Sequence, residues 1–149
     1  MRTAFTMIEL IFVIVILGIL AAVAIPKLSA TRTDALISKT AQDIMSGASE
    51  IASYAVSNGK TLSDLSLMSN GIASLVSSGS AVLDTTNKKA TIAFGGVSDC
   101  VTLQVLTSTT DDNLTLTLKT GITNAKCLGL QSKIDAKKYP MKLRGQYVK

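Results

Sequence analysis

The sequence predicts an α+β protein in which one long N-terminal helix packs against a small antiparallel sheet. No charged residue occurs from Leu10 to Pro26, which is typical of a helix surrounded by apolar material. Between Ile37 and Ala55, apolar residues recur at alternating steps of four and three, the spacing of one helix face. Apolar and polar residues alternate at 101–105 and again at 114–118, as in half-buried strands.

The first predicted element is a membrane-spanning helix. With Phe5–Ile8 included, the apolar segment extends to Pro26 and covers roughly 33 Å as a helix, which is enough to cross a bilayer. Glu9 is the one charged residue inside this segment. A charge in such a place is costly unless it is paired, so Glu9 is a candidate functional residue.

Two general explanations fit the length of this segment. A secretory signal peptide would use Arg2 as its basic start and the sequence Ala22-Val23-Ala24 as its cleavage site. A plain N-terminal anchor would remain in the membrane. Neither explains Glu9, which interrupts the apolar core that both require.

A third explanation accounts for Glu9. The hexamer Ala4-Phe5-Thr6-Met7-Ile8-Glu9 resembles the processing site of type IV prepilins and of type II secretion pseudopilins. In this family, prepilin peptidase cuts before a Phe, the new terminus is N-methylated, and a glutamate four residues later serves assembly. The family usually has Gly before the cut, where this chain has Ala4. The resemblance is specific over residues 1–32 and includes Gly18 and Pro26.

The resemblance implies a division of the chain into three parts. Residues 1–4 are a leader, cleaved so that Phe5 becomes the methylated terminus; residues 5–26 are a transmembrane and filament-core helix; and residues 27–149 are a periplasmic or extracellular pilin-like head. The subunit would reside in the bacterial inner membrane with lipid around it, and then join a filament of identical copies through the inner-membrane assembly machinery. Glu9 would pair with the amine of a neighbouring copy.

The apolar stripe from Ile37 to Ala55 has two explanations. A sheet or loop of the same domain covers it, which we favour, or a coiled-coil partner does. The helix is expected to end at Asn58-Gly59. Thr61-Leu62-Ser63-Asp64 resembles a capping box that begins a short helix through Met68. Asn70-Gly71 is expected to form a turn, followed by a helical turn at residues 72–76.

The sheet is expected to contain strands at 89–94, 101–105 and 114–118, and a last strand at 141–148. Asp111-Asp112-Asn113 is expected in a solvated hairpin turn between two of these strands. A calcium site there is the alternative, but the spaced ligands of a calcium loop are missing.

The two cysteines, Cys100 and Cys127, are expected to form a disulfide if the domain is exported. Two reduced buried thiols are the alternative for a cytosolic domain. Closing this loop would stabilise the domain by roughly 3 kcal/mol in the chain-entropy model.

The composition argues against an enzyme and predicts no cofactor or metal. Histidine is absent from all 149 residues, so catalytic serine–histidine pairs and histidine metal ligands do not occur. The acidic residues are scattered along the chain without a spacing that joins them.

The formal net charge of +5 is concentrated in residues 133–149. We favour the interpretation that these cations form the outer face of an edge strand, where lysine discourages aggregation. One alternative is nucleic-acid binding by these cations, aided by stacking on Tyr139 and Tyr147, in a monomeric membrane-anchored binding module. Another is contact with a partner, in which these cations neutralise an acidic patch on the next subunit. The basic residues with this candidate role are Lys137, Lys138, Lys142 and Arg144.

Overall fold

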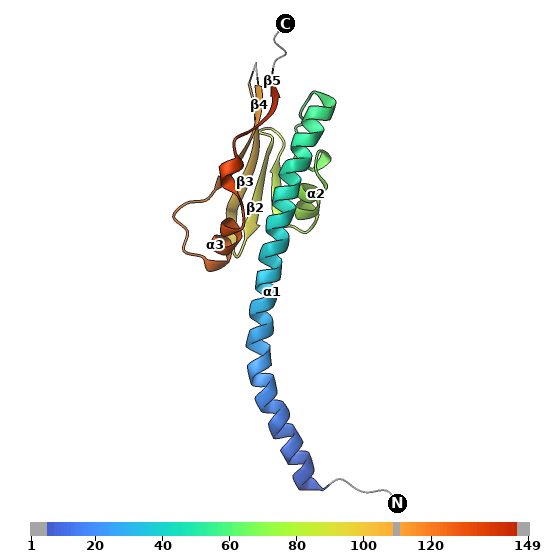
Figure 1. Ribbon diagram of the computed structural model, residues 1–149, viewed down its shortest axis with the longest axis vertical. Coiled ribbons are helices and arrows are strands. Elements are labelled where there is room, and N and C mark those ends of the chain that lie inside the picture. Colours follow the sequence, from blue (N-terminus) through green and yellow to red (C-terminus); the bar gives the residue numbers. More distant parts are fainter. Residues whose placement is uncertain (1–5, 109–110, 146–149) are drawn as a thin grey trace, which may run out of the picture. The chain divides into compact units, whose positions relative to one another are not determined.

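The structure, a computed structural model, describes residues 6–108 and 111–145, except the side chains of residues 144 and 145 (Figure 1). The chain falls into two units, Met1–Leu36 and Ile37–Lys149. Helix α1 (Met7–Asn58) contributes residues to both. This long helix and a five-stranded antiparallel sheet confirm the α+β class that the sequence predicts.

In the first unit, α1 is apolar on all sides from Leu10 to Pro26. Its large apolar side chains from Met7 to Leu28 are all exposed, from 41% at Ile16 to 77% at Met7. The helix continues through Pro26. It is long and apolar enough to cross a membrane by length and composition, and is compatible with a single-pass anchor.

In the second unit, here called the head, α1 buries one face. Ile44, Ala48 and Ile51 are fully buried, and they belong to one core with Ile92 and Leu103 of the sheet. The stripe is therefore covered by its own domain, as we favoured over a coiled-coil partner. The helix ends at Asn58, and Gly59 follows with a φ of 62°.

The segment after α1 differs from the predicted capping box. Helix η1 (Leu65–Leu67) is a single 3₁₀ turn, and its N-cap is Asp64, whose carboxylate accepts a hydrogen bond from the Ser66 N–H at 2.8 Å. The Thr61 hydroxyl instead donates to Asp112 at 3.1 Å. A short helix before Met68 is therefore present as predicted, but the capping box that starts at Thr61 is wrong, because the helix is a 3₁₀ turn capped by Asp64.

The predicted turn at Asn70-Gly71 is also wrong, because helix α2 (Asn70–Ser77) begins there. Ser69 is its N-cap, with Oγ accepting from the Ile72 N–H at 3.0 Å. The Glu50 carboxylate on α1 accepts from the Ser69 hydroxyl at 2.8 Å and from the Gly71 N–H at 3.1 Å. These bonds satisfy amide groups that a helix start leaves open, and they outweigh the turn preference of Asn-Gly.

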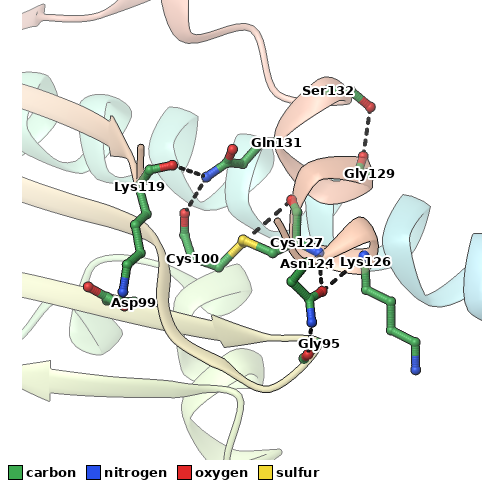
Figure 2. The surroundings of a disulfide bond; sticks show 10 residues. All are labelled: Gly95, Asp99, Cys100, Lys119, Asn124, Lys126, Cys127, Gly129, Gln131 and Ser132. Carbon is green, nitrogen blue, oxygen red and sulfur yellow. Dashed lines mark hydrogen bonds and ion pairs between the residues drawn. A yellow bond between two sulfur atoms is a disulfide. The ribbon is translucent and has the colours of Figure 1, made fainter. Parts of the chain in front are cut away.

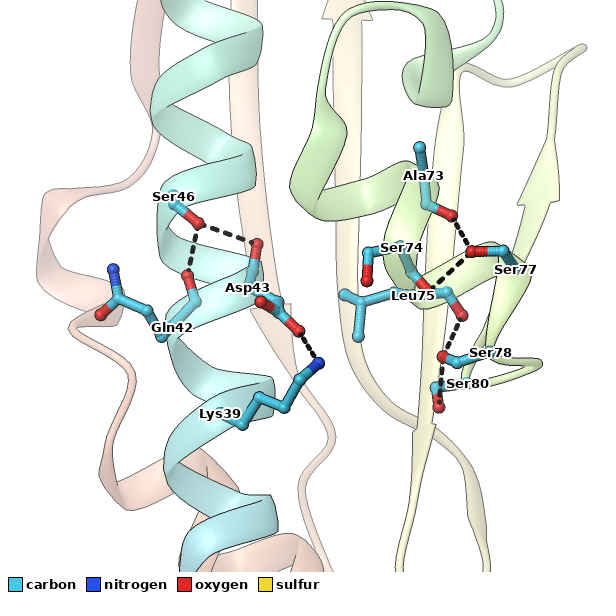
Figure 3. A network of polar contacts seen from close by, with 10 residues as sticks. All are labelled: Lys39, Gln42, Asp43, Ser46, Ala73, Ser74, Leu75, Ser77, Ser78 and Ser80. Carbon is cyan, nitrogen blue, oxygen red and sulfur yellow. Dashed lines mark hydrogen bonds and ion pairs between the residues drawn. The ribbon is translucent and has the colours of Figure 1, made fainter.

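Helices α1 and α2 cross closely at two glycines. A Cβ on Gly71 would lie 2.5 Å from the Asp43 carbonyl oxygen and 3.1 Å from the Gly47 Cα. No side chain fits at that distance from backbone. Figure 3 shows this part of α1 beside α2, with the ion pair of Lys39 and Asp43 on α1. The Lys39 Nζ and Asp43 Oδ2 atoms of this pair are 2.8 Å apart.

The sheet is an antiparallel meander in the order β1-β2-β3-β4-β5. Its strands are β1 (Ala81–Asp84), β2 (Lys89–Phe94), β3 (Val97–Thr107), β4 (Asp111–Leu118) and β5 (Met141–Gly145). The predicted strands at 89–94, 101–105 and 114–118 are confirmed. Sequence reasoning missed β1, which is too short for its alternation to be recognised.

Asp111-Asp112-Asn113 does not form the predicted solvated turn. All three residues lie in β4, and Asp112 is fully buried. The strand was not recognised in the sequence here, because carboxylates are uncommon in strand interiors. The last strand begins at Met141 as predicted, with Leu143 buried and Lys142 exposed, but residues 146–148 lie outside the described part.

Between β4 and β5 the chain forms helix α3 (Ala125–Ser132) and the 3₁₀ turn η2 (Ala136–Lys138). Helices α2 and α3 lie on opposite sides of the head portion of α1 (Figure 1). A Cβ on Gly129 would lie 3.0 Å from Ile37 Cδ1, so α3 packs directly on α1 at this point.

Candidate functional site

Glu9 forms a reciprocal cap at the start of α1. The Thr6 N–H and the Thr6 hydroxyl both donate to Glu9 Oε2, at 2.8 Å and 2.7 Å. The Glu9 N–H donates back to Thr6 Oγ1 at 3.4 Å. This is the capping box of a Thr followed three residues later by a Glu. Sequence reasoning missed it, although the residues Thr6-Met7-Ile8-Glu9 carry the signal.

The cap leaves half of the carboxylate available. All three bonds use Oε2 or the Glu9 amide, and Glu9 Oε1 accepts no hydrogen bond from the residues that the structure describes. Glu9 itself is exposed. Ala4 and Phe5, the predicted cleavage and methylation site, lie outside the described residues.

The predicted disulfide is present between Cys100 on β3 and Cys127 on α3, with their Cα atoms 5.8 Å apart. Both cysteines are fully buried in the head core. The alternative of two reduced thiols is therefore not what the structure has. The bond joins α3 to the centre of the sheet.

Two amide side chains hold α3 beside the disulfide (Figure 2). Asn124 caps α3 by accepting from the Lys126 and Cys127 N–H groups, and its Nδ2 donates to the Gly95 carbonyl at 2.7 Å. Near the other end of α3, Gln131 Nε2 donates to the Cys100 carbonyl at 2.9 Å and to the Lys119 carbonyl at 3.0 Å. Helix α3 is thus fixed to the strands at both ends.

The two aspartates that could have bound calcium, Asp111 and Asp112, have partners within the protein. Asp111 forms an ion pair with Lys142 at 3.1 Å, and Asp112 Oδ2 accepts from Thr61. Within the described residues, no three His, Cys, Asp or Glu side chains gather as metal ligands do.

The structure spreads the predicted cationic residues over two elements. Lys137 and Lys138 lie in η2, and Lys142 and Arg144 lie in β5, where Arg144 is opposite Asp112 in the backbone register. Lys138 pairs with Asp135 at 3.7 Å, as Lys142 pairs with Asp111. These exposed pairs contribute little stability, but they reduce the local positive charge.

Tyr139 packs partly against the head and so presents only part of its ring for stacking. It is half-buried against the head core, and this burial, followed by the nearby Asp135 carboxylate, raises the pKa of its phenol. Tyr147, the other predicted stacking residue, lies outside the described residues.

The site therefore combines a capped glutamate near the start of an apolar helix with a disulfide-closed head. Comparisons of this chain with protein-family models, with curated proteins and with solved structures found no match.

Proposed function

We propose that this chain is the structural subunit of a type IV pilus-like filament, cleaved after Ala4 and assembled through α1. The observation that carries the proposal is Glu9. It is the one carboxylate in an otherwise apolar helical segment whose side chains have no cover of their own. Such a segment requires lipid or other helices around it. In a filament, the α1 helices of neighbouring copies would surround it as a parallel bundle.

Pairing in the membrane gives Glu9 its role. An uncompensated carboxylate costs about 2.5–3.5 kcal/mol near the bilayer centre, and less toward the interface. Cleavage after Ala4 creates an amine on Phe5, and the amine of a neighbouring copy removes this cost by binding Glu9 Oε1, which the Thr6 cap leaves open. The pair also fixes the axial position of each copy against the next.

The head supports a surface role for the rest of the chain. It has its own core and a disulfide, so it is stable without the membrane segment being buried in it. A disulfide of this kind suits a domain outside the cytoplasm. The head would form the outer layer of the filament, and catalysis takes no part in this mechanism.

Electron microscopy of sheared cell-surface fractions tests the proposal with two variants that separate charge from capping. Glu9→Gln keeps an oxygen for the cap but loses the charge, whereas Thr6→Ala loses the cap hydroxyl but keeps the charge. We expect Glu9→Gln to abolish filaments and Thr6→Ala to retain them.

Abundant, normally ordered filaments from Glu9→Gln would contradict the mechanism. If the wild-type chain gives no fibres and remains monomeric in the membrane, the filament proposal itself is wrong, and a membrane-anchored binding module replaces it.

A further inference from the structure

The acidic side chains of the head bind partners within the head. Each Asp or Glu of residues 37–149 has at least one hydrogen-bond or ion-pair partner within the head. These residues are Asp43, Glu50, Asp64, Asp84, Asp99, Asp111, Asp112 and Asp135. A cation of the head without an ion pair therefore competes with existing partners for every carboxylate of its own head.

Lys133 is such a cation, and it borders a hollow. It is the C-cap residue of α3, its side chain is exposed, and its ammonium makes no ion pair or hydrogen bond with a described residue. With Ser38, Ala41, Gln42 and Met45 of α1, it lines an open hollow of about 210 Å³. Figure 3 shows Gln42 on the side of α1 that faces away from α2. The α1 wall of the hollow therefore combines the Ser38 hydroxyl and the Gln42 amide with the apolar Ala41 and Met45, and the α3 wall is cationic.

Asp34 is the complementary group. It lies on α1 one helical turn before Ser38, it is exposed, and its carboxylate has no partner among the described residues. Besides Glu9, it is the one acidic residue of the first unit. Both acids of that unit thus lie on α1 with accepting oxygen atoms that the described residues leave unused.

We propose that Lys133 and the hollow beside it bind Asp34 of a second copy of this chain. The inference rests on the proposed function and adds a second contact to it. If Glu9 of one copy is level with the Phe5 amine of its neighbour, the two α1 helices are displaced by four residues, or about 6 Å. The same displacement makes the neighbour's Asp34 level with Ser38, the first residue of the hollow.

Two ion pairs separated along one helix fix register better than one. A single pair near the membrane leaves the heads free to turn, because helices in contact tolerate a range of crossing angles. A second pair at the base of the head removes that freedom. Charge pairs of this kind contribute mainly to specificity, because a like-charge contact is strongly unfavourable.

A charge swap tests the pair. We expect Asp34→Lys and Lys133→Glu to reduce the yield of sheared filaments about tenfold or more each, and the double variant to restore most of that yield. Lys133→Arg keeps the charge and should retain filaments. Lys137→Glu is the matched control, because Lys137 is also an exposed lysine whose ammonium has no partner among the described residues, but it does not line the hollow.

The outcomes separate this inference from the proposed function. Full filament yield from both single variants, or failure of the double variant to recover, overturns the Asp34–Lys133 contact while leaving filament formation by the wild-type chain intact. Equal loss from Lys137→Glu also overturns it, since binding of a polyanion such as DNA by the whole basic segment would then explain the data. A wild-type chain without filaments overturns both. Membrane levels and the Cys100–Cys127 disulfide, followed by gel mobility, verify that each variant folds.

Discussion

The two portions of α1 differ in how their apolar side chains are arranged and buried, although they belong to one helix. Through Pro26, apolar residues surround the helix axis and their side chains are exposed, as at Ile14, which is 56% exposed. From Ile37, one face is apolar and buried, as at Ile44, which is fully buried. The head portion is thus stabilised by the chain's own sheet, whereas the first portion has exposed apolar side chains that we propose are covered by lipid or by other copies.

The largest expected difference between the two portions comes from matched isoleucine substitutions. Ile44→Ala should lower the free energy of unfolding of the head by about 2–5 kcal/mol, because it leaves a cavity in the core. Ile14→Ala should change the same quantity by less than about 0.5 kcal/mol. Denaturant unfolding of the full chain in detergent, followed by a probe in the head, measures both. Similar losses from the two variants would show that the first portion also supports the head.

The next effect is that of the disulfide, which lies wholly in the head. Replacing both cysteines, Cys100→Ser with Cys127→Ser, should lower the free energy of unfolding by about 3 kcal/mol. Asn124 and Gln131 still hold α3, so we expect the folded state to retain its helix content in circular dichroism. A variant that is unfolded in water would show that the amide contacts do not suffice.

Matched glycine substitutions should give a smaller difference. Gly71→Ala forces a Cβ against the backbone of α1 and should cost about 1–3 kcal/mol of head stability. At Gly18, nothing lies within 4 Å of an added Cβ, so Gly18→Ala should leave the head unchanged. Thermal unfolding of both variants compares them. A stable Gly71→Ala protein would mean that α2 moves away from α1 easily.

The smallest effect concerns pH and again belongs to the head. Hydrogen bonds, first from the Gly71 N–H and then from the Ser69 hydroxyl, lower the pKa of the Glu50 carboxyl. A carboxyl whose pKa is lower in the folded state stabilises the fold above its unfolded pKa, and this contribution is lost as the pH falls through the folded value. The wild-type chain should therefore lose slightly more stability than Glu50→Gln between about pH 5 and pH 3. Urea midpoints across this range measure the difference, and parallel curves would contradict it.

Much of the head was predictable where one periodicity dominates. The stripe on α1 and the alternating strands at 101–105 and 114–118 follow directly from the spacing of apolar residues. The errors occurred where tertiary contacts override local preference. Contacts with Glu50 stabilise a helix start where Asn70-Gly71 predicts a turn, and pairing with β3 and β5 keeps residues 111–113 in β4 despite their polar side chains.

Some features of the candidate site could be predicted from the sequence and others could not. The pairing of Cys100 with Cys127 was predictable because the chain has two cysteines. Glu9 stood out because it is the one charge in an apolar segment, but its bond to Thr6 was overlooked. The hollow beside Lys133 was not predictable, because α3 itself was missed, and its lining comes from residues far apart in the sequence.

The mass of the mature N-terminus tests the central claim most directly. The account predicts that mass spectrometry of the protein from its native membrane finds a chain beginning at a methylated Phe5. A chain beginning at Ile25 would show an ordinary signal peptide, and an intact Met1 would show a plain anchor. Either of these results would contradict the account, because the amine that Glu9 is proposed to bind would not exist at Phe5.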